Sequence, residues 1–208
     1  MSKPILYGFP LSTFVRTARI VLAEKGVDYE LQNVDLGSTE YRQLHPFGKV
    51  PAFRHDDLVL CETLAIADYV DHAFEGPALQ PSVPADKARM LAWISASNDY
   101  YYGTLIRKIV LQRFAPKLFN RPADEAVVAA ALPEAEALVQ HLDRSLSSTS
   151  WLVGAEPTLG DWFLLPIVFY LHLVPDTKDM VEKAGNLQRW FAAANRRNSV
   201  AASVPSLT

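Results

Sequence analysis

Residues 75–84 read Glu-Gly-Pro-Ala-Leu-Gln-Pro-Ser-Val-Pro and separate two parts of the chain that differ in hydrophobic periodicity. Three prolines within eight residues remove backbone donors and interrupt any regular helix. Short β-rich runs alternate with helical spacing before this stretch, whereas only helical spacing follows it. We therefore predict an α/β domain at residues 1–76, a linker at 77–85 and an all-helical domain at 86–208.

The first part contains the pattern of a small α/β unit. Apolar residues at helical spacing follow the first apolar run and end at Lys25-Gly26. A second helix is predicted from near Glu62, because Ile66, Val70 and Phe74 are spaced by four. The predicted strands lie at residues 5–7, 29–34, 51–53 and 58–60.

The second part is predicted to be helical throughout. One helix is expected from near Ala85 toward Phe114, ending before Pro116, and another at residues 127–146. Thr-Leu-Gly-Asp at 158–161 has the form of a capping box at the start of a helix. The residues after it are apolar on all sides, which predicts that this helix is buried all round.

Composition restricts the classes of function. The 208 residues are 50% hydrophobic and 21% charged, as in a folded globular protein. A net charge of −3 gives no electrostatic basis for binding nucleic acid. The longest apolar stretch is well short of the ~20 residues that cross a bilayer. With one cysteine, Cys61, and no secretory signal, a cytoplasmic protein without an intramolecular disulfide or a membrane partner is expected.

A motif at residues 7–13 reads Tyr-Gly-Phe-Pro-Leu-Ser-Thr and precedes the first predicted helix. It places the Ser12 hydroxyl where a strand turns into a helix, whose free amides and positive dipole favour an anion. The ordinary alternative is that Ser12 or Thr13 only caps the helix.

Two further motifs follow, Gly-Lys-Val-Pro at 48–51 and Cys-Glu-Thr at 61–63. The valine–proline pair forms either a rigid turn, a cis peptide or a plain strand-edge proline. Glu62 and Thr63 open a helix, where their side chains either cap amides or hold the ammonium and carboxylate of a ligand. Each motif alone is weak evidence.

Together and in this order, the motifs resemble those of the glutathione transferase superfamily, over a range from Lys3 to about Val200. The match is most similar to phi-like and related bacterial serine-type members, which carry Gly-x-Pro-x-Ser-Thr, Asn-Pro-x-Gly-(Lys/Gln)-Val-Pro and Glu-Ser-x-Ala-Ile. The chain differs in having His45 for the usual Asn and Thr63 for the commoner Ser. The resemblance implies a thioredoxin-like N-terminal domain of order βαβ-α-ββα and an all-α C-terminal helical bundle.

The resemblance also implies a site for glutathione. Ser12 would donate to the glutathione sulfur and Lys49 would approach the glycyl carboxylate. The Val50 backbone, held by a cis Pro51, would pair with the cysteinyl backbone. The γ-glutamyl end would be held by Glu62 and Thr63. Arg42 is left open as a further carboxylate ligand.

A small hydrophobic electrophile would then bind in a cleft between the domains. Candidate lining residues are Phe9, Leu11, Tyr100, Tyr101, Ile106 and Phe114. The alternative for the aromatic run on the helix is ordinary core or a dimer interface.

The expected chemistry is activation of a thiol. A free cysteine thiol has a pKa of ~8.5, so little is thiolate at neutral pH. Donation by Ser12 and the helix amides would lower this pKa, and a shift of ~2 units corresponds to ~2.7 kcal/mol. Thr13 and Tyr7 are the alternatives for this role, although Tyr7 suits core packing better.

Other functions stay open at this stage. Glutathione-dependent reduction of disulfides or peroxides would use the same site, and a non-catalytic binding module would have the same fold. No metal is expected, because the five histidines lack a ligand-like spacing. The resemblance further implies a homodimer.

Overall fold

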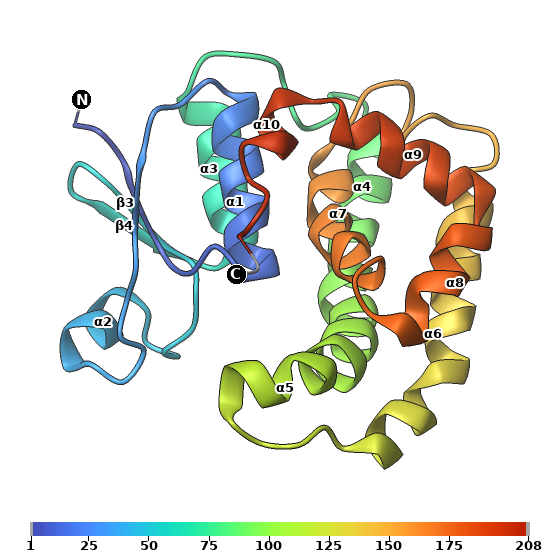
Figure 1. Ribbon diagram of the computed structural model, residues 1–208. Coiled ribbons are helices and arrows are strands. Elements are labelled where there is room, and N and C mark those ends of the chain that lie inside the picture. The colour runs from blue at the N-terminus through green and yellow to red at the C-terminus, as the bar shows by residue number, and fades with distance from the viewer. Residues whose placement is uncertain (1, 207–208) are drawn as a thin grey trace. The chain divides into compact units, whose positions relative to one another are not determined.

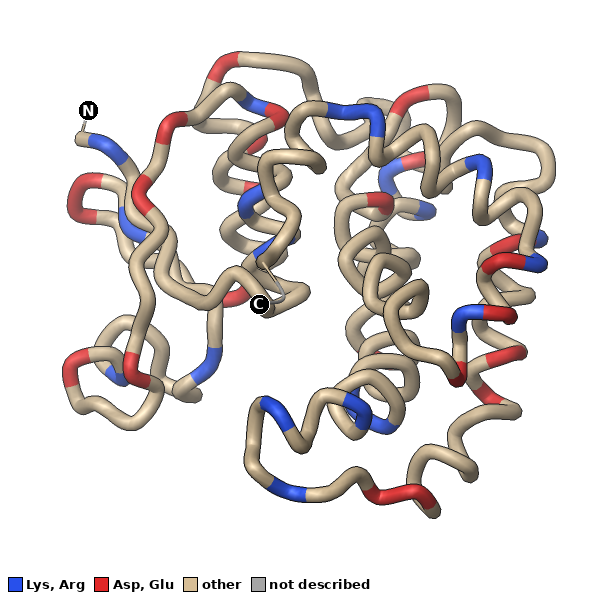
Figure 2. Tube along the Cα trace, viewed as in Figure 1, with Lys and Arg blue, Asp and Glu red and all other residues tan. Residues whose placement is uncertain are grey.

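The computed structural model describes residues 2–206 and contains two compact units (Figure 1). The described residues up to Gln80, together with those from Asn195 on, form the first unit. Pro81–Ala194 form the second unit. Basic and acidic residues are interspersed along the chain in both (Figure 2), in keeping with the small net charge. No described helix is long and apolar enough to span a membrane.

The first unit is built on a four-stranded mixed sheet. Its strands are β1 (Ile5–Tyr7), β2 (Glu30–Gln32), β3 (Ala52–His55) and β4 (Leu58–Cys61). Their order in the sheet is β2-β1-β3-β4, with β1 and β2 parallel and the other pairs antiparallel. All four lie within a residue or two of the predicted runs, except that β2 is shorter than predicted.

Three helices follow the strands in the predicted order, and a fourth comes from the end of the chain. They are α1 (Thr13–Glu24), α2 (Thr39–Leu44), α3 (Thr63–Ala73) and α10 (Asn198–Ala201). α1 and α3 pack side by side against each other (Figure 1). Leu6 and Phe53 of the sheet and Val15 of α1 are wholly buried and belong to the hydrophobic core of this unit.

The second unit is helical, as predicted. Its elements are α4 (Pro84–Ala96), the π-helix η1 (Ser97–Val110), α5 (Leu111–Phe119), α6 (Glu125–Ser145), α7 (Leu159–Leu171), α8 (Pro175–Lys183) and α9 (Gly185–Asn195). α7 packs against α4 and η1, and all but one of its residues are buried. The fold class, a thioredoxin-like α/β domain followed by an all-α domain, is confirmed.

The helix predicted to end before Pro116 continues to Phe119. Pro116 lies on the exposed side of α5, where water can satisfy the carbonyl group that a proline leaves without a donor. The chain leaves α5 through Asn120, whose φ of 49° is left-handed.

The described residues from Asn195 on form a C-terminal segment that belongs to the first unit, whereas the prediction placed them in the helical domain. Arg197 donates to both carboxylate oxygens of Glu24, with its Nε and Nη2 at 2.7 and 2.6 Å. Arg19 donates to the Ala202 carbonyl at 2.9 Å. These bonds attach the C-terminal segment to α1. They could not be predicted from local sequence patterns, because the bonded residues are far apart along the chain.

The start of the predicted linker is tied to the same unit. Lys25 and Asp71 form a buried ion pair at 3.3 Å. Asp71 also accepts from the Leu79 amide at 2.9 Å, and Lys25 donates to the Pro77 carbonyl at 3.1 Å. The Pro77 carbonyl and the Leu79 amide are therefore both paired, and these bonds fix the path of the chain as it leaves the first unit.

Candidate functional site

The strand register brings the three motifs to one end of the sheet. Tyr7, the last residue of β1, pairs with Ala52, the first of β3. Ala52 in turn pairs with Cys61, the last residue of β4. The segments that adjoin these residues, 8–12, 50–51 and 62–63, therefore emerge at the same end. This convergence defines the candidate site.

The turn after β1 positions Ser12. At Gly8, a side chain would place its Cβ 2.4 Å from Val15 Cγ2, and φ is +155°, so only glycine fits. Ser12 follows as the N-cap of α1, and its hydroxyl accepts from the Val15 amide at 3.4 Å. The Ser12 side chain is half-buried. It keeps a hydroxyl proton for donation to a ligand, because it acts only as an acceptor toward the helix.

The two alternatives to Ser12 are both buried. Tyr7 lies in a core cluster with Tyr41 and Ala52, as its packing role predicts. Thr13 is buried, and its hydroxyl has no hydrogen-bond partner among the described residues. Of the three residues, Ser12 is the only one that is not buried.

The Val50–Pro51 peptide bond is cis, as the resemblance implies. The exposed Lys49 lies just before it. The Tyr41 hydroxyl donates to the Lys49 carbonyl at 2.6 Å and so holds this segment from α2. Burial raises the pKa of Tyr41 to about 12, so the phenol stays protonated and remains a donor.

Glu62 is the N-cap residue of α3, with the unusual backbone φ of +71°. Its exposed side chain makes no capping bond to the helix. Strained backbone of this kind persists where the surroundings demand it, and such positions cluster at functional sites. Thr63 follows and is buried. The site thus presents the Lys49 ammonium, the Glu62 carboxylate and the start of α1 to a ligand.

His45, which the sequence indicated only as a replacement for the usual Asn and not as a site residue, also lies here. His45, the C-cap residue of α2, is 2% exposed, and burial lowers its pKa. One potential metal-binding atom from each of His45, Cys61 and Glu62 lies within 4.8 Å of the others. The histidines are scattered in the sequence, and only the packing of α2 against β4 makes this grouping visible.

The predicted electrophile-binding residues fall in both units, and each is described within its own. In the first unit, Leu11 is exposed and Phe9 is half-buried. In the helical unit, Tyr100 is 62% exposed. Ile106 is buried in the core of that unit, and the half-buried Phe114 packs edge-on against Tyr170.

Tyr101 is tied into the helical unit by its hydroxyl. It is 1% exposed, and its hydroxyl lies 2.9 Å from His141 Nδ1 and donates to the Leu138 carbonyl at 3.3 Å. Burial raises its pKa well above the usual range. Its contacts are those of a core residue, and its predicted role toward an electrophile stays a prediction.

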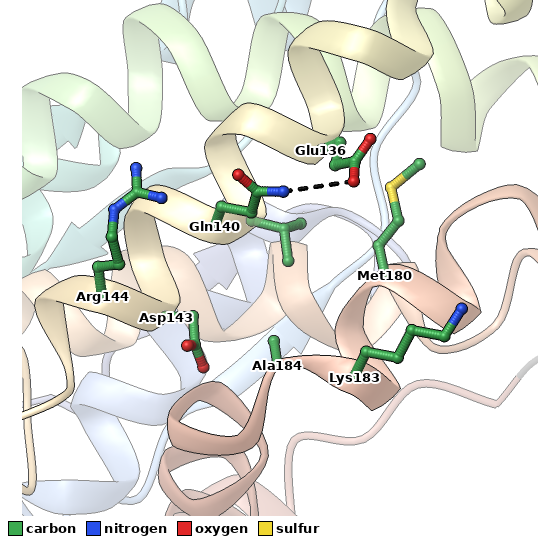
Figure 3. Close-up of a pocket in the computed structure, with 8 residues that line it drawn as sticks. Glu136, Gln140, Asp143, Arg144, Met180, Lys183 and Ala184 are labelled. Atoms are coloured by element: carbon green, nitrogen blue, oxygen red, sulfur yellow. Dashed lines mark hydrogen bonds between the residues drawn. The ribbon is translucent and has the colours of Figure 1, made fainter.

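A separate cavity of about 310 Å³ lies in the helical unit between α6 and α8 (Figure 3). Its lining mixes both charges, and Gln140 donates to Glu136 at 3.3 Å beside it. Asp143, which also lines it, caps α9 by accepting from the Asn186 and Leu187 amides at 2.8 and 2.9 Å. These partners give Asp143 a structural role.

Comparison with known proteins gives the family. The model "Glutathione S-transferase, N-terminal domain" matches residues 6–78, and "Glutathione S-transferase, C-terminal domain" matches residues 125–193. Glutathione S-transferase F10 of Arabidopsis thaliana is 30% identical over 183 residues, which covers 81% of this chain and 85% of that protein. The chain belongs to the glutathione S-transferase family, and the predicted enzyme class is thereby confirmed.

Solved structures agree with this assignment. The crystal structure of glutathione transferase F7 from Populus trichocarpa has a TM-score of 0.88 at 26% identity, covering 98% of this chain and 100% of that one. A theta class glutathione S-transferase from Xanthomonas axonopodis pv. citri, with glutathione bound, has a TM-score of 0.87 at 27% identity and covers both chains fully.

Proposed function

We propose that the chain binds glutathione at this end of the sheet and activates its thiol for attack on a small hydrophobic electrophile. The observation that carries the proposal is the convergence of Ser12, cis Pro51 and Glu62, which the register of β1, β3 and β4 produces. Family membership supports glutathione as the co-substrate.

In the proposed binding mode, different residues of the site hold the two ends and the middle of glutathione. The exposed Lys49 ammonium suits the glycyl carboxylate, and the Val50 backbone suits the cysteinyl backbone. Glu62 suits the γ-glutamyl ammonium, since its carboxylate is not used to cap α3. Thr63 and the first amides of α3 suit the γ-glutamyl carboxylate.

Ser12 works as a donor in this mechanism and not as a base, because its own proton is too tightly held. The thiol loses its proton to solvent, and the Ser12 hydroxyl and the amides at the start of α1 stabilise the resulting thiolate. The thiolate then attacks an electrophilic carbon; a carbon–sulfur bond forms as the leaving group departs with its electron pair.

The first prediction concerns Ser12→Ala, with Thr13→Val as the matched control. Loss of a hydrogen bond to a charged group costs about 1.5–3 kcal/mol, so kcat/KM should fall by about 10–150-fold. The thiol pKa of bound glutathione, followed by ultraviolet absorbance of the thiolate, should rise. Thr13→Val should keep both values, because the Thr13 hydroxyl has no partner in the described structure.

A substrate panel tests the function as a whole. Retention on immobilised glutathione and turnover of a chloronitroaromatic compound are expected. Loss of both would favour a non-catalytic binding module. Turnover of disulfides or peroxides without conjugation would favour the reductase or peroxidase alternative. An unchanged thiol pKa in Ser12→Ala would point to Thr13 or Tyr7.

We also propose that the protein is a homodimer, as the family resemblance implies. Analytical ultracentrifugation of the wild-type chain should give twice the mass of one chain. A single-chain mass across the concentration range would contradict this.

A further inference from the structure

Three side chains with different metal-binding atoms meet beside the proposed glutathione site. His45 comes from the end of α2, Cys61 from the end of β4, and Glu62 from the N-cap of α3. One ligand atom from each lies within 4.8 Å of the other two. Packing of α2 against β4 brings the histidine to the cysteine and the glutamate.

His45 is the unusual member of the group. It is 2% exposed, and among the described residues its Nδ1 has no hydrogen-bond partner on any other residue. Buried polar atoms in native proteins nearly always have a partner, so an unpaired one needs a physical explanation, and a role in binding an ion is one such explanation. Glu62 likewise keeps its carboxylate off the helix that it precedes.

We propose that His45, Cys61 and Glu62 bind a borderline-soft divalent cation, of which Zn²⁺ is the type. Imidazole, thiolate and carboxylate together are the donor set of zinc, whereas magnesium and calcium take oxygen ligands. Three protein ligands leave a fourth position for water or an added ligand.

The geometry requires a small contraction about the ion. Zinc ligands lie about 2.0–2.3 Å from the metal, which places neighbouring ligand atoms about 3.5 Å apart. The separations of up to 4.8 Å therefore shorten by about 1 Å. Rotation of the exposed Glu62 side chain and the half-buried Cys61 thiol supplies this change. The positive charge of Lys49 near His45 disfavours a bound cation. Because Lys49 is exposed, its charge is solvated and screened.

The cation and glutathione exclude each other, because both use Glu62. This part of the inference rests on the proposed function, whereas binding of the cation does not. A metal ion at this position would switch off the transferase without touching Ser12.

Metal binding is tested on the tag-free 208-residue chain with Co²⁺ and Zn²⁺ and without glutathione. The Co²⁺ complex should hold one ion per chain and show a thiolate-to-cobalt charge-transfer band. Zn²⁺ affinity is measured by competition with a chromophoric chelator. His45→Asn and Cys61→Ser should each weaken it at least about tenfold, since loss of a supporting partner alone costs about 10–100-fold. Cys61→Ser should also abolish the band.

The matched control is His72→Asn, an exposed histidine of α3 whose Nδ1 contacts the Asp68 carbonyl. It should bind Zn²⁺ as the wild type does, and thermal unfolding checks that every variant is folded. Absence of the charge-transfer band in the wild type, or wild-type affinity in both site variants, would overturn the proposal.

S-methylglutathione, which has no free thiol to chelate the metal, tests the exclusion. It should displace Zn²⁺ from the wild-type chain. Binding to the metal-free chain without displacement of Zn²⁺ would overturn the exclusion. Failure to bind the metal-free chain would instead count against the proposed glutathione site, and the cobalt and zinc titrations would still decide the metal site.

Discussion

At the scale of single residues, Tyr41 links the buried core of the first unit to the candidate site. Its ring is buried with Tyr7 and Ala52, and its hydroxyl holds the carbonyl of Lys49, the residue proposed to meet the glycyl carboxylate. Tyr41 is thus a positioning residue: it acts through the segment before cis Pro51.

Tyr41→Phe should raise KM for glutathione several-fold and leave kcat nearly unchanged, because only ground-state positioning is loosened. Steady-state kinetics with glutathione varied measures this split. Tyr29→Phe is the control, since the Tyr29 hydroxyl accepts from Arg19 Nε at 3.2 Å and, among the described residues, is not hydrogen-bonded to the Lys49 segment. An equal fall in kcat would contradict a positioning role.

Tyr41 also predicts a pH dependence. Its folded pKa of about 12 exceeds the ordinary value of 10.0, because burial disfavours the phenolate. The unfolded chain therefore loses this proton first, so the stability that the neutral phenol contributes is complete below pH 10 and is lost as the pH rises toward 12. Urea unfolding across this range should show a smaller alkaline loss in Tyr41→Phe than in the wild type.

At the scale of elements, Asp161 organises the start of the buried helix α7. Its carboxylate accepts from the Thr158 amide at 2.8 Å, which is the bond that the capping box predicts. It also accepts from the Leu152 amide at 3.0 Å and from Trp190 Nε1 at 2.8 Å. Burial raises the pKa of Asp161, and these donors oppose that shift. One side chain therefore joins a loop, α7 and α9.

Asp161→Asn should lower the free energy of unfolding by about 2–4 kcal/mol. The asparagine NH₂ group replaces one carboxylate oxygen, so a buried donor faces another donor and loses its acceptor. Asp143→Asn is the matched control. Asp143 accepts both α9 amides through Oδ1, which an asparagine side-chain oxygen can still do, so only the part-buried bond from Asn186 Nδ2 to Oδ2 is lost. Urea denaturation measures both; equal losses in the two variants would contradict the argument.

At the scale of the whole molecule, the first unit is assembled from chain segments far apart in sequence. The described residues up to Gln80 are completed by the C-terminal segment, and α10 packs on α1. Glu24, with a side chain 4% exposed, receives Arg197 and the Ser199 hydroxyl from that segment. Folding of the unit therefore depends on residues that follow the entire helical unit.

A double-mutant cycle on Glu24→Ala and Arg197→Ala should give a coupling free energy of about 1–2 kcal/mol. Two hydrogen bonds join the guanidinium to the carboxylate, and the Glu24 side chain is buried. The exposed pair Lys3–Asp28 serves as the comparison, and its coupling should lie below about 1 kcal/mol. Urea unfolding of each single and double variant gives these values. Equal coupling in the two pairs would show that burial of Glu24 does not strengthen its pair with Arg197.

Local patterns predicted much of the fold. The linker prolines, the strand runs and the capping box at Thr158 depend on nearest neighbours, and these are what a sequence displays directly. Pro116 misled the same reasoning, because a proline is tolerated in a helix when its freed carbonyl faces water. The C-terminal segment was missed, since Arg197 and Glu24 are paired only by tertiary packing.

The sequence by itself determined the two-part architecture, the family resemblance and the identity of Ser12, Pro51 and Glu62 as site candidates. These follow from periodicity and short motifs, whose physics is local. Tertiary structure alone decided that these motifs share one end of the sheet, and that His45 meets Cys61 and Glu62 there. Strand register and helix packing set those distances, and neither can be derived from spacing along the chain.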